Sequence, residues 1–318
     1  MLSRVTDLAL EVRESFPKDD VEISGVEIEK RDIGVSGITM TVIDIKDKHG
    51  EKAMGKPVGK YITLEFSDRE WEKNDEMGLE KVLKDIIEET VSKKIVEADK
   101  KTKPINIEIR TGENISKKVV KLDRKRKESY KKIMIAGLGN RYATPDMLGN
   151  KVIEYMDIVP ERICAIAPGV LSQTGMETCD IIKNIVTNEK FDCIIVIDSL
   201  CSRHTERLCH TIQITDTGIS PGAGVGNKRK KINENVMGIP VIAIGVPTVV
   251  SMATVAYDCI EETLLAQGFS QEETQIFLGQ MSNDKYSGLF VTPKDIDEQI
   301  FFIGKAIANG INSALKEL

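Results

Sequence analysis

Five short and almost entirely apolar runs follow residue 130, and they constrain the fold more than any other feature of the chain. They read KIMIAGLG, RICAIAPG, CIIVIDSL, TIQITDTG and PVIAIGVP, and they are separated by stretches such as METCDIIKNIVTNEK that suit helices. Strands that are apolar along their whole length are typical of a parallel sheet covered on both faces. The sequence therefore predicts an α/β fold with a doubly wound, mostly parallel sheet and helices on both faces.

The first 130 residues have a different pattern and are rich in charged side chains. Residues 37–47 and 60–66 alternate apolar and polar side chains, which predicts half-exposed strands. In residues 79–91 apolar side chains recur at steps of three and four, which predicts an amphipathic helix. We expect residues 8–130 to form a β-rich N-terminal extension of one domain, whose main sheet comes from residues 131–318.

Composition excludes several classes of partner. The net charge is −6, the pI is about 5.4 and only 5% of residues are aromatic, which argues against nucleic-acid binding. No secretory signal and no apolar run of membrane-spanning length is present, so we expect a cytoplasmic protein without membrane contact. The six cysteines form no C-x-x-C pair, which favours buried, reduced thiols. The basic run at residues 121–132 is more typical of a solvated face than of a substrate-docking patch.

Two aspartates stand where ligands gather in such folds, at the carboxyl ends of strands. In GLGNRYATPDMLG the third glycine of a dinucleotide fingerprint is replaced by Tyr142. Thr144 can instead cap a helix that begins at Pro145, which places Asp146 in its first turn. Asp198 directly follows the apolar run of VIDSL, where a lone buried carboxylate would be costly. We interpret both as functional carboxylates, with a helix-start aspartate and a structural cap as the alternatives.

The glycine-rich segment GISPGAGVGNKRKK offers a second binding element. It is not a P-loop, because no hydroxyl residue follows its lysine. Its glycine amides, together with Lys228 and Arg229, could still bind a carboxylate, although a flexible surface loop would have the same composition. In TDTG, Asp216 is a third candidate carboxylate that we expect in the same neighbourhood.

The motifs occur in an order that resembles a known family. The resemblance lies in GLGNRYATPDMLG, IAPGVLSQTGMETCDII, IIVIDSLCSRHTER, TIQITDTGISPGAGVGNKRK and GIPVIAIGVPTVV, and also in TDLALE, GKYITLE and LFVTPKDID. In these motifs the chain resembles the germination protease of spore-forming Firmicutes. The resemblance implies an atypical aspartic endopeptidase that degrades small acid-soluble spore proteins during germination. It also implies a fold similar to that of hydrogenase-maturation peptidases, a homotetrameric self-processing zymogen, a location in the forespore or spore core, and no cofactor.

The resemblance also assigns residues. The catalytic pair of the family maps onto Asp146 in TPDMLG and Asp198 in VIDSL. Two nearby carboxylates hold one proton between them, so one can activate water while the other protonates the leaving amine. The family prefers an acidic residue, then a hydrophobic one, then a small one, and we expect Arg203, Lys228 and Arg229 to hold the acidic side chain.

That preference predicts a processing site near the start of the chain. Thr6-Asp7-Leu8-Ala9 has the acidic, hydrophobic and small residues in the required order. We expect self-cleavage between Asp7 and Leu8, which would make residues 1–7 a propeptide and residues 8–318 the peptidase domain.

Two other functions remain open from the sequence. One is a metal-dependent peptidase or maturation enzyme on the same fold, with Asp146 and Asp198 as ligands and His204 as a candidate third ligand. His210 cannot easily join His204, because residues six apart lie on different faces of a helix. The other is a non-catalytic spore module that binds proteins.

Overall fold

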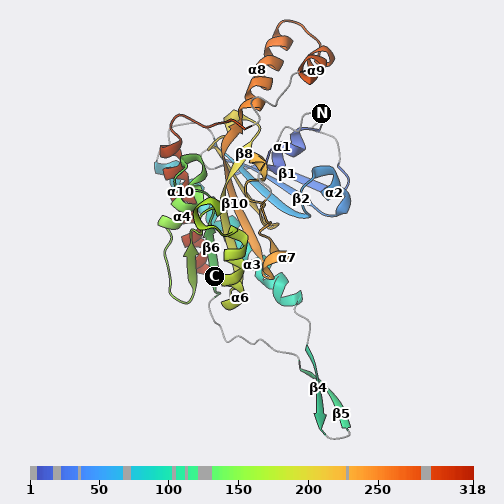
Figure 1. Ribbon diagram of the computed structural model, residues 1–318, viewed down its shortest axis with the longest axis vertical. Helices are drawn as coiled ribbons and strands as arrows, with labels where there is room; N and C mark the ends of the chain where they lie inside the picture. The colour runs from blue at the N-terminus through green and yellow to red at the C-terminus, as the bar shows by residue number, and fades with distance from the viewer. Residues whose placement is uncertain are drawn as a thin grey trace.

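A mixed β-sheet runs through the centre of the molecule (Figure 1). The computed structural model describes residues 6–16, 23–34, 37–66, 73–101, 105–111, 114–120, 131–226, 229–280 and 288–318. In spatial order the strands are β1 (Val26–Asp32), β2 (Thr39–Ile45), β3 (Gly59–Glu65), β9 (Thr211–Thr215), β10 (Val241–Ser251), β8 (Cys193–Ser202), β6 (Ile133–Gly137) and β7 (Ile163–Ile166), and β11 (Phe290–Val291) pairs with β10.

Four of the five predicted apolar runs form the parallel part of this sheet. Strands β10, β8, β6 and β7 are neighbours and run parallel to one another. The fifth run, β9, lies antiparallel between β3 and β10. Strands β1 to β3 extend the same sheet in antiparallel order. An apolar composition indicates that a strand is covered on both faces, but it does not indicate whether the strand runs parallel or antiparallel to its neighbours.

Helices cover both faces of the sheet, as the sequence predicts. On one face the sheet packs against α3 (Lys73–Lys101), α4 (Leu148–Glu154) and α10 (Ile296–Glu317), and on the other against α6 (Thr178–Asn188) and α7 (Glu234–Met237). Strand β8 serves both layers because its side chains alternate. Ile195 and Ile197 belong to the first layer, and Ile194 and Val196 to the second.

The amphipathic helix expected over residues 79–91 lies within α3. Leu79, Leu83, Ile87 and Val91 are buried and face the large core cluster of α10 and the sheet. They recur every four residues and therefore form one stripe of the helix.

The N-terminal segment forms a smaller cluster at the edge of the sheet. Helix α1 (Ala9–Glu14) packs Ala9 and Leu10 against Ile43 and Ile45 of β2. Asp47 is the N-cap of helix α2 (Lys48–Met54), and its side chain accepts hydrogen bonds from the amides of His49 and Gly50. This cluster fixes the position of residues 6–16 on the body of the protein.

Two elements extend away from the central sheet in Figure 1. One is the pair α8 (Met252–Ala266) and α9 (Gln271–Gly279), and the other is the hairpin β4 (Ile105–Thr111) and β5 (Asn114–Val120). Residues 121–130 of the basic run lie outside the described residues.

The remaining predictions from composition can also be compared with the structure. All six cysteines are free; Cys179, Cys193, Cys201 and Cys209 are buried, and Cys259 is exposed. Among the described helices, none has both the length and the apolar character needed to cross a membrane.

Candidate active site

Asp198 lies where a neighbouring strand ends. In the parallel pairing of β6 and β8, Gly137 is opposite Ile197, and the amide of Leu138 donates to the carbonyl of Ile197 at 2.8 Å. Strand β6 stops there, whereas β8 continues to Ser202. Asp198 is therefore not at the end of its own strand, as the sequence suggested, but at the carboxyl end of β6. It is only 4% exposed.

The turn after β6 presents Asp146. Gly139 has a φ of +98°, and a Cβ there would lie 1.8 Å from the carbonyl oxygen of Asp146, so only glycine fits. The amide of Asn140 donates to Oδ2 of Asp146 at 2.8 Å. Thr248 of β10 donates through Oγ1 to the carbonyl of Pro145 at 2.6 Å and ties the turn to the sheet. Neither Asn140 nor Thr248 carries a sequence signal for this role.

The helix expected to begin at Pro145 has a different form. Residues Thr144–Asp146 form one short 3-10 turn, η1, and Thr144 does not cap it. The α-helix that follows, α4, begins at Leu148. Asp146 therefore lies just before this helix and not in its first turn.

The two carboxylates share one electrostatic environment. Burial raises the pKa of Asp146, and the hydrogen bond from Asn140 offsets part of this rise. The pKa of Asp198 lies well above its usual range, first because of burial and then because of the negative charges of Asp146 and Asp7. The charge of one carboxylate thus makes ionisation of the other less favourable.

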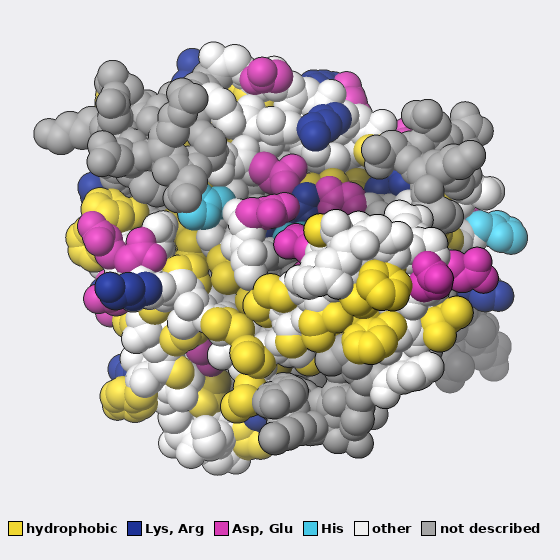
Figure 2. All heavy atoms as spheres, turned by 90° about the horizontal axis from the view of Figure 1, so that it is seen from above, with side chains coloured by type: hydrophobic (Ala, Val, Ile, Leu, Met, Phe, Trp, Pro, Cys, Tyr) yellow, Lys and Arg dark blue, Asp and Glu magenta, His cyan; other side chains and the backbone are white. Residues whose placement is uncertain are grey.

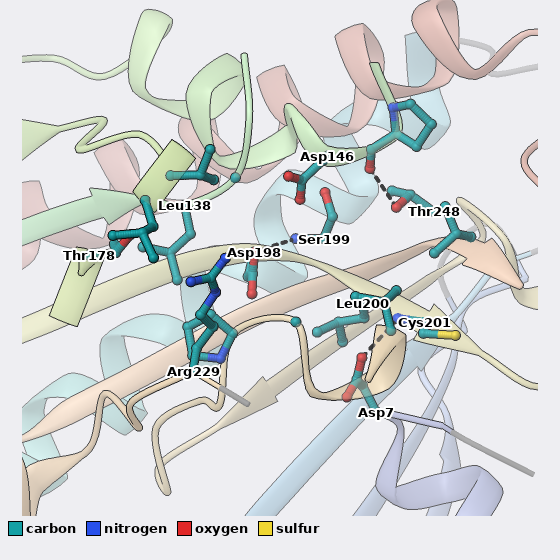
Figure 3. Close-up of a pocket in the computed structure, with 18 of the residues that line it drawn as sticks. Asp7, Leu138, Asp146, Thr178, Asp198, Ser199, Leu200, Cys201, Arg229 and Thr248 are labelled. Carbon is teal, nitrogen blue, oxygen red and sulfur yellow. Dashed lines mark hydrogen bonds between the residues drawn. The ribbon is translucent and has the colours of Figure 1, made fainter. Parts of the chain in front are cut away.

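Both aspartates open into one cavity of about 410 Å³ (Figure 3). The volume lies in the range of natural ligand pockets, which is roughly 300–1,000 Å³. The Asp146 side chain comes from the turn after β6, and the Asp198 side chain comes from β8. Thr178 and Cys179 at the start of α6 also line the cavity, as does Ser199, whose buried hydroxyl has no hydrogen-bond partner among the described residues.

A third carboxylate, that of Asp7, lies in the same cavity. Its Oδ2 accepts a hydrogen bond from the amide of Cys201 at 2.9 Å, and its own amide donates to the carbonyl of Cys201 at 2.9 Å. The amide of Gly224 also bonds to the Asp7 carboxylate. One glycine amide of the loop thus contacts a carboxylate, that of Asp7, which the sequence did not indicate.

The peptide group after Asp7 has its own partner. The ammonium of Lys56 donates to the carbonyl oxygen of Asp7 at 2.9 Å, and more weakly to that of Thr6 at 3.4 Å. Burial raises the pKa of Asp7, and the contacts with Cys201 and the charge of Lys56 lower it in part. Lys56 precedes β3 and belongs to none of the sequence motifs.

The basic residues expected at the site lie in different places. Arg229 lines the cavity, and its Nη1 pairs with Glu177 at 3.2 Å. Arg203 is not among the residues that line the cavity; its amide donates to Glu11 at 2.8 Å. Lys228 lies outside the described residues.

Asp216 is not part of this site, contrary to the prediction. It binds the ammonium of Lys94 at 2.9 Å and the amide of Lys60 at 2.8 Å. Because β9 is antiparallel to β10, its last residue, Thr215, pairs near the start of β10, at Ala243. The end of β9 is thus turned toward the amino ends of the parallel strands, away from Asp198.

His204, the candidate third metal ligand, does not line the cavity either. Its amide donates to Glu11 at 3.1 Å. Across the part of the chain that the structure describes, no three His, Cys, Asp or Glu side chains are grouped as metal ligands would be.

Fold and site together define an α/β protein with a cavity built around paired carboxylates. Among known families, that of the germination protease matches residues 96–286. The germination protease of Caldanaerobacter subterraneus subsp. tengcongensis is 39% identical, covering 98% of this chain and 94% of that protein. Those of Clostridium perfringens strain SM101 and Bacillus subtilis strain 168 are 38% and 34% identical, each covering 98% of this chain.

The chain belongs to the germination protease family and is a protease. A solved structure is also similar, that of the [NiFe] hydrogenase maturation protease HycI from Thermococcus kodakarensis KOD1. The similarity covers 58% of this chain and 94% of that one, with a TM-score of 0.34 and 15% identity.

Proposed function

We propose that this protein is an aspartic-type endopeptidase that initiates the degradation of small acid-soluble spore proteins during spore germination. The observation that carries the proposal is the cavity into which Asp146 and Asp198 both open, with a raised pKa on each. A pair of close carboxylates that cannot both ionise easily is suited to hydrolysis by an activated water molecule. No cofactor is needed for this chemistry.

The burial of the two groups suggests their roles. Asp198 is the more deeply buried and retains the shared proton, while Asp146 carries the negative charge. Asp146 takes a proton from water, and the water oxygen attacks the peptide carbonyl carbon. Asp198 then donates its proton to the departing amine as the C–N bond breaks. The pair again holds one proton, now on Asp146, and exchange between the two restores the starting state.

The direct test is degradation of a purified small acid-soluble spore protein. We expect the wild-type chain to cleave it, and Asp146→Asn to lower kcat/KM by about 10³-fold, since one of the two proton-transfer groups is lost. Electrophoresis and mass spectrometry of the products measure both rates. Full activity of Asp146→Asn would rule out the proposed role of this residue.

The position of Asp7 supports self-cleavage between Asp7 and Leu8 and release of residues 1–7 as a propeptide. The Asp7 side chain already lies in the cavity, and Lys56 holds the carbonyl oxygen of the bond to be cut. We expect incubation at mildly acid pH to yield a chain that begins at Leu8. N-terminal sequencing measures this product, and Asp198→Asn should remain uncut. An active enzyme that still begins at Met1 would contradict the proposal.

The contacts of Asp7 also suggest how an acidic substrate residue is held. Arg203, Lys228 and Arg229 remain candidates, and we add the amides of Cys201 and Gly224, which bind the Asp7 carboxylate. These amides would bind an acidic side chain of a substrate in the same way once residues 1–7 have left.

A substitution at Gly224 tests this binding mode. A Cβ at Gly224 would lie 2.2 Å from Oδ2 of Asp7 and 2.5 Å from Cβ of Cys201, so alanine would fill the space of the carboxylate and move the loop away from β8. We expect Gly224→Ala to lower kcat/KM for peptides with an acidic residue before the cut by about tenfold or more, because the carboxylate loses its partners. Gly279→Ala is the control, because a Cβ there meets no atom of the described residues within 4 Å. Equal kinetics of the two variants would contradict this binding mode.

We further propose that the protein is a homotetramer of the forespore and spore core. The α8–α9 end, toward the viewer in Figure 2, carries exposed hydrophobic side chains that self-association would cover. They include Leu265, Phe269, Ile276 and Phe277. Analytical ultracentrifugation of the purified chain tests the stoichiometry, and a monomer at micromolar concentration would contradict it.

A further inference from the structure

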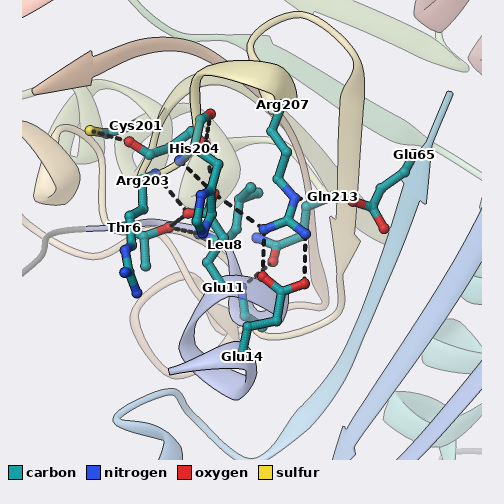
Figure 4. Close-up of polar contacts among 12 residues, drawn as sticks. Thr6, Leu8, Glu11, Glu14, Glu65, Cys201, Arg203, His204, Arg207 and Gln213 are labelled. Atoms are coloured by element: carbon teal, nitrogen blue, oxygen red, sulfur yellow. Dashed lines mark hydrogen bonds and ion pairs between the residues drawn. The ribbon is translucent and has the colours of Figure 1, made fainter. Parts of the chain in front are cut away.

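Glu11 is a buried carboxylate that the proposed chemistry does not use. It is 1% exposed, yet both of its oxygens are bound (Figure 4). Oε1 accepts from Oγ of Ser202 at 2.7 Å and from the amide of His204 at 3.1 Å. Oε2 accepts from the amide of Arg203 at 2.8 Å and from the hydroxyl of Thr6. Glu11 thus binds the turn that directly follows β8, the strand of Asp198.

One hydroxyl group links Glu11 to the nitrogen of Leu8. Oγ1 of Thr6 accepts from the amide of Leu8 at 3.0 Å and donates to Oε2 of Glu11. Leu8 is the N-cap of α1, and Glu11 is the third residue of that helix. A glutamate at this position commonly reaches back to the N-cap amide. Here the Thr6 hydroxyl lies between the Glu11 carboxylate and the Leu8 amide and bridges the two.

Carboxylates outnumber cations around Glu11, although the buried ammonium of Lys56, which donates to the Asp7 carbonyl oxygen at 2.9 Å, also interacts with it. Glu11, Glu14 and Glu65 all contact the guanidinium of Arg207, at 3.4, 2.6 and 3.0 Å. Three carboxylates therefore share this one guanidinium. The Glu11 carboxylate is almost fully buried, and a nearby positive charge stabilises a buried carboxylate more than an exposed one. The dipole of the short helix α1 weakly opposes a cation at its start. A carboxylate in direct contact outweighs that effect.

We propose that Glu11 is the binding site for the α-ammonium group that forms on Leu8 when the chain is processed. This inference rests on the proposed self-cleavage. Hydrolysis breaks the C–N bond between Asp7 and Leu8, adds the water oxygen to Asp7 and turns the Leu8 amide into an ammonium with three N–H donors. The Thr6 hydroxyl departs with residues 1–7, which leaves the Leu8 nitrogen and Oε2 of Glu11 without this partner.

A direct ion pair between the Leu8 ammonium and Glu11 replaces the lost bridge. It keeps α1 and the Ser202 to His204 turn in place while Asp7 leaves the cavity. The same cut that empties the cavity therefore creates the charge that holds the new N-terminus at the end of β8.

Two chains that differ by one residue test this site. In both, a SUMO domain replaces residues 1–7 and is removed by its protease after purification, leaving either Leu8 or an added glycine before Leu8 as the N-terminus. The added residue moves the ammonium by roughly 3.8 Å. Each chain is made with Glu11 and with Glu11→Gln. Because the SUMO protease makes the terminus, the result does not depend on self-cleavage, and failure of the proposed function would be seen separately.

We expect the unfolding equilibrium constant in urea at pH 7 to be at least tenfold smaller for the chain that begins at Leu8. In the Glu11→Gln pair this difference should fall to less than twofold. A difference below twofold with Glu11 present, or an undiminished difference with Gln, would overturn the proposal.

A second measurement needs no substitution of Glu11. Both chains are labelled uniformly with ¹³C and ¹⁵N, and the titration of the unmodified α-amine is followed by NMR through the carbon shifts of the first residue. The midpoint should be roughly one pH unit higher for the chain that begins at Leu8, because the carboxylate stabilises the charged amine. An equal or lower midpoint would overturn the proposal even if a Glu11 variant does not fold.

Discussion

An Asp198→Asn variant is expected to lose proteolysis and, at neutral pH, to be more stable than the wild type. Loss of the shared proton site should lower kcat/KM by about 10³-fold or more. The gain in stability comes from burial, because Asp198 is 4% exposed and stands near the charges of Asp146 and Asp7. An amide of the same size avoids this cost, and we expect a gain on the order of 1 kcal/mol in the free energy of unfolding.

The pH dependence of the stability gain has a defined sign. The pKa of Asp198 is raised in the folded state. Between its unfolded and folded pKa values, the folded chain therefore binds more protons than the unfolded chain, and stability falls as pH rises. The stability that this group contributes is fully present below the unfolded pKa and is lost as pH rises through the folded pKa. The advantage of Asn over Asp should therefore be absent in acid and should increase toward neutral pH.

Urea denaturation between pH 4 and 8 measures this effect, with Asp157→Asn as the control. The side chain of Asp157 is 61% exposed and contacts Lys316 at 3.4 Å, so its substitution should change stability by less than about 0.5 kcal/mol throughout. An Asp198→Asn variant that is less stable than the wild type at pH 7 would show that the stability cost of the raised pKa of Asp198 does not dominate at this position.

Glu11→Ala is expected to be among the most destabilising substitutions in the described N-terminal segment. It leaves buried donors of Ser202, Arg203 and His204 without the acceptor that they share. Removal of a buried charged partner typically costs about 3–5 kcal/mol. Urea unfolding at pH 7 measures the loss in the intact chain.

Glu14→Ala is the matched control for Glu11→Ala. Glu14 lies on the same helix and contacts the same guanidinium at 2.6 Å, but its side chain is 37% exposed. An exposed ion pair contributes little, so the expected loss is about 1 kcal/mol or less. Similar losses for the two variants would show that Glu11 is not the anchor of this segment.

The proposed catalytic pair follows from two apolar runs that the sequence marks clearly, although only Asp146 lies beyond the end of its strand and Asp198 lies within β8. Asp146 and Asp198 each follow an apolar run of a parallel strand, and ligands of such sheets gather beyond these runs. The same argument was wrong for Asp216. Its strand is also apolar, but it is antiparallel to its neighbour β10, and periodicity carries no information on direction.

Asp7 shows the other limit of the sequence. Its motif predicts a processing site, but nothing in the motif says that the side chain would lie 2.9 Å from the amide of Cys201, almost two hundred residues away. Thr248 and Lys56 likewise acquire their contacts with Pro145 and Asp7 only in the folded chain. Such contacts depend on long-range packing, which local patterns do not encode.

The sequence by itself indicated which segments form the buried strands and which helices cover both faces of the sheet, because the burial of apolar side chains leaves a pattern in each segment, and it marked the two aspartates of the proposed pair as polar residues beyond apolar runs. Only the tertiary structure decided the order and direction of the strands and the approach of Asp7 and Glu11 to the end of β8. Those features are set by hydrogen bonds and charges between segments far apart in the chain. Their strength depends on burial, which exists only once the chain has folded.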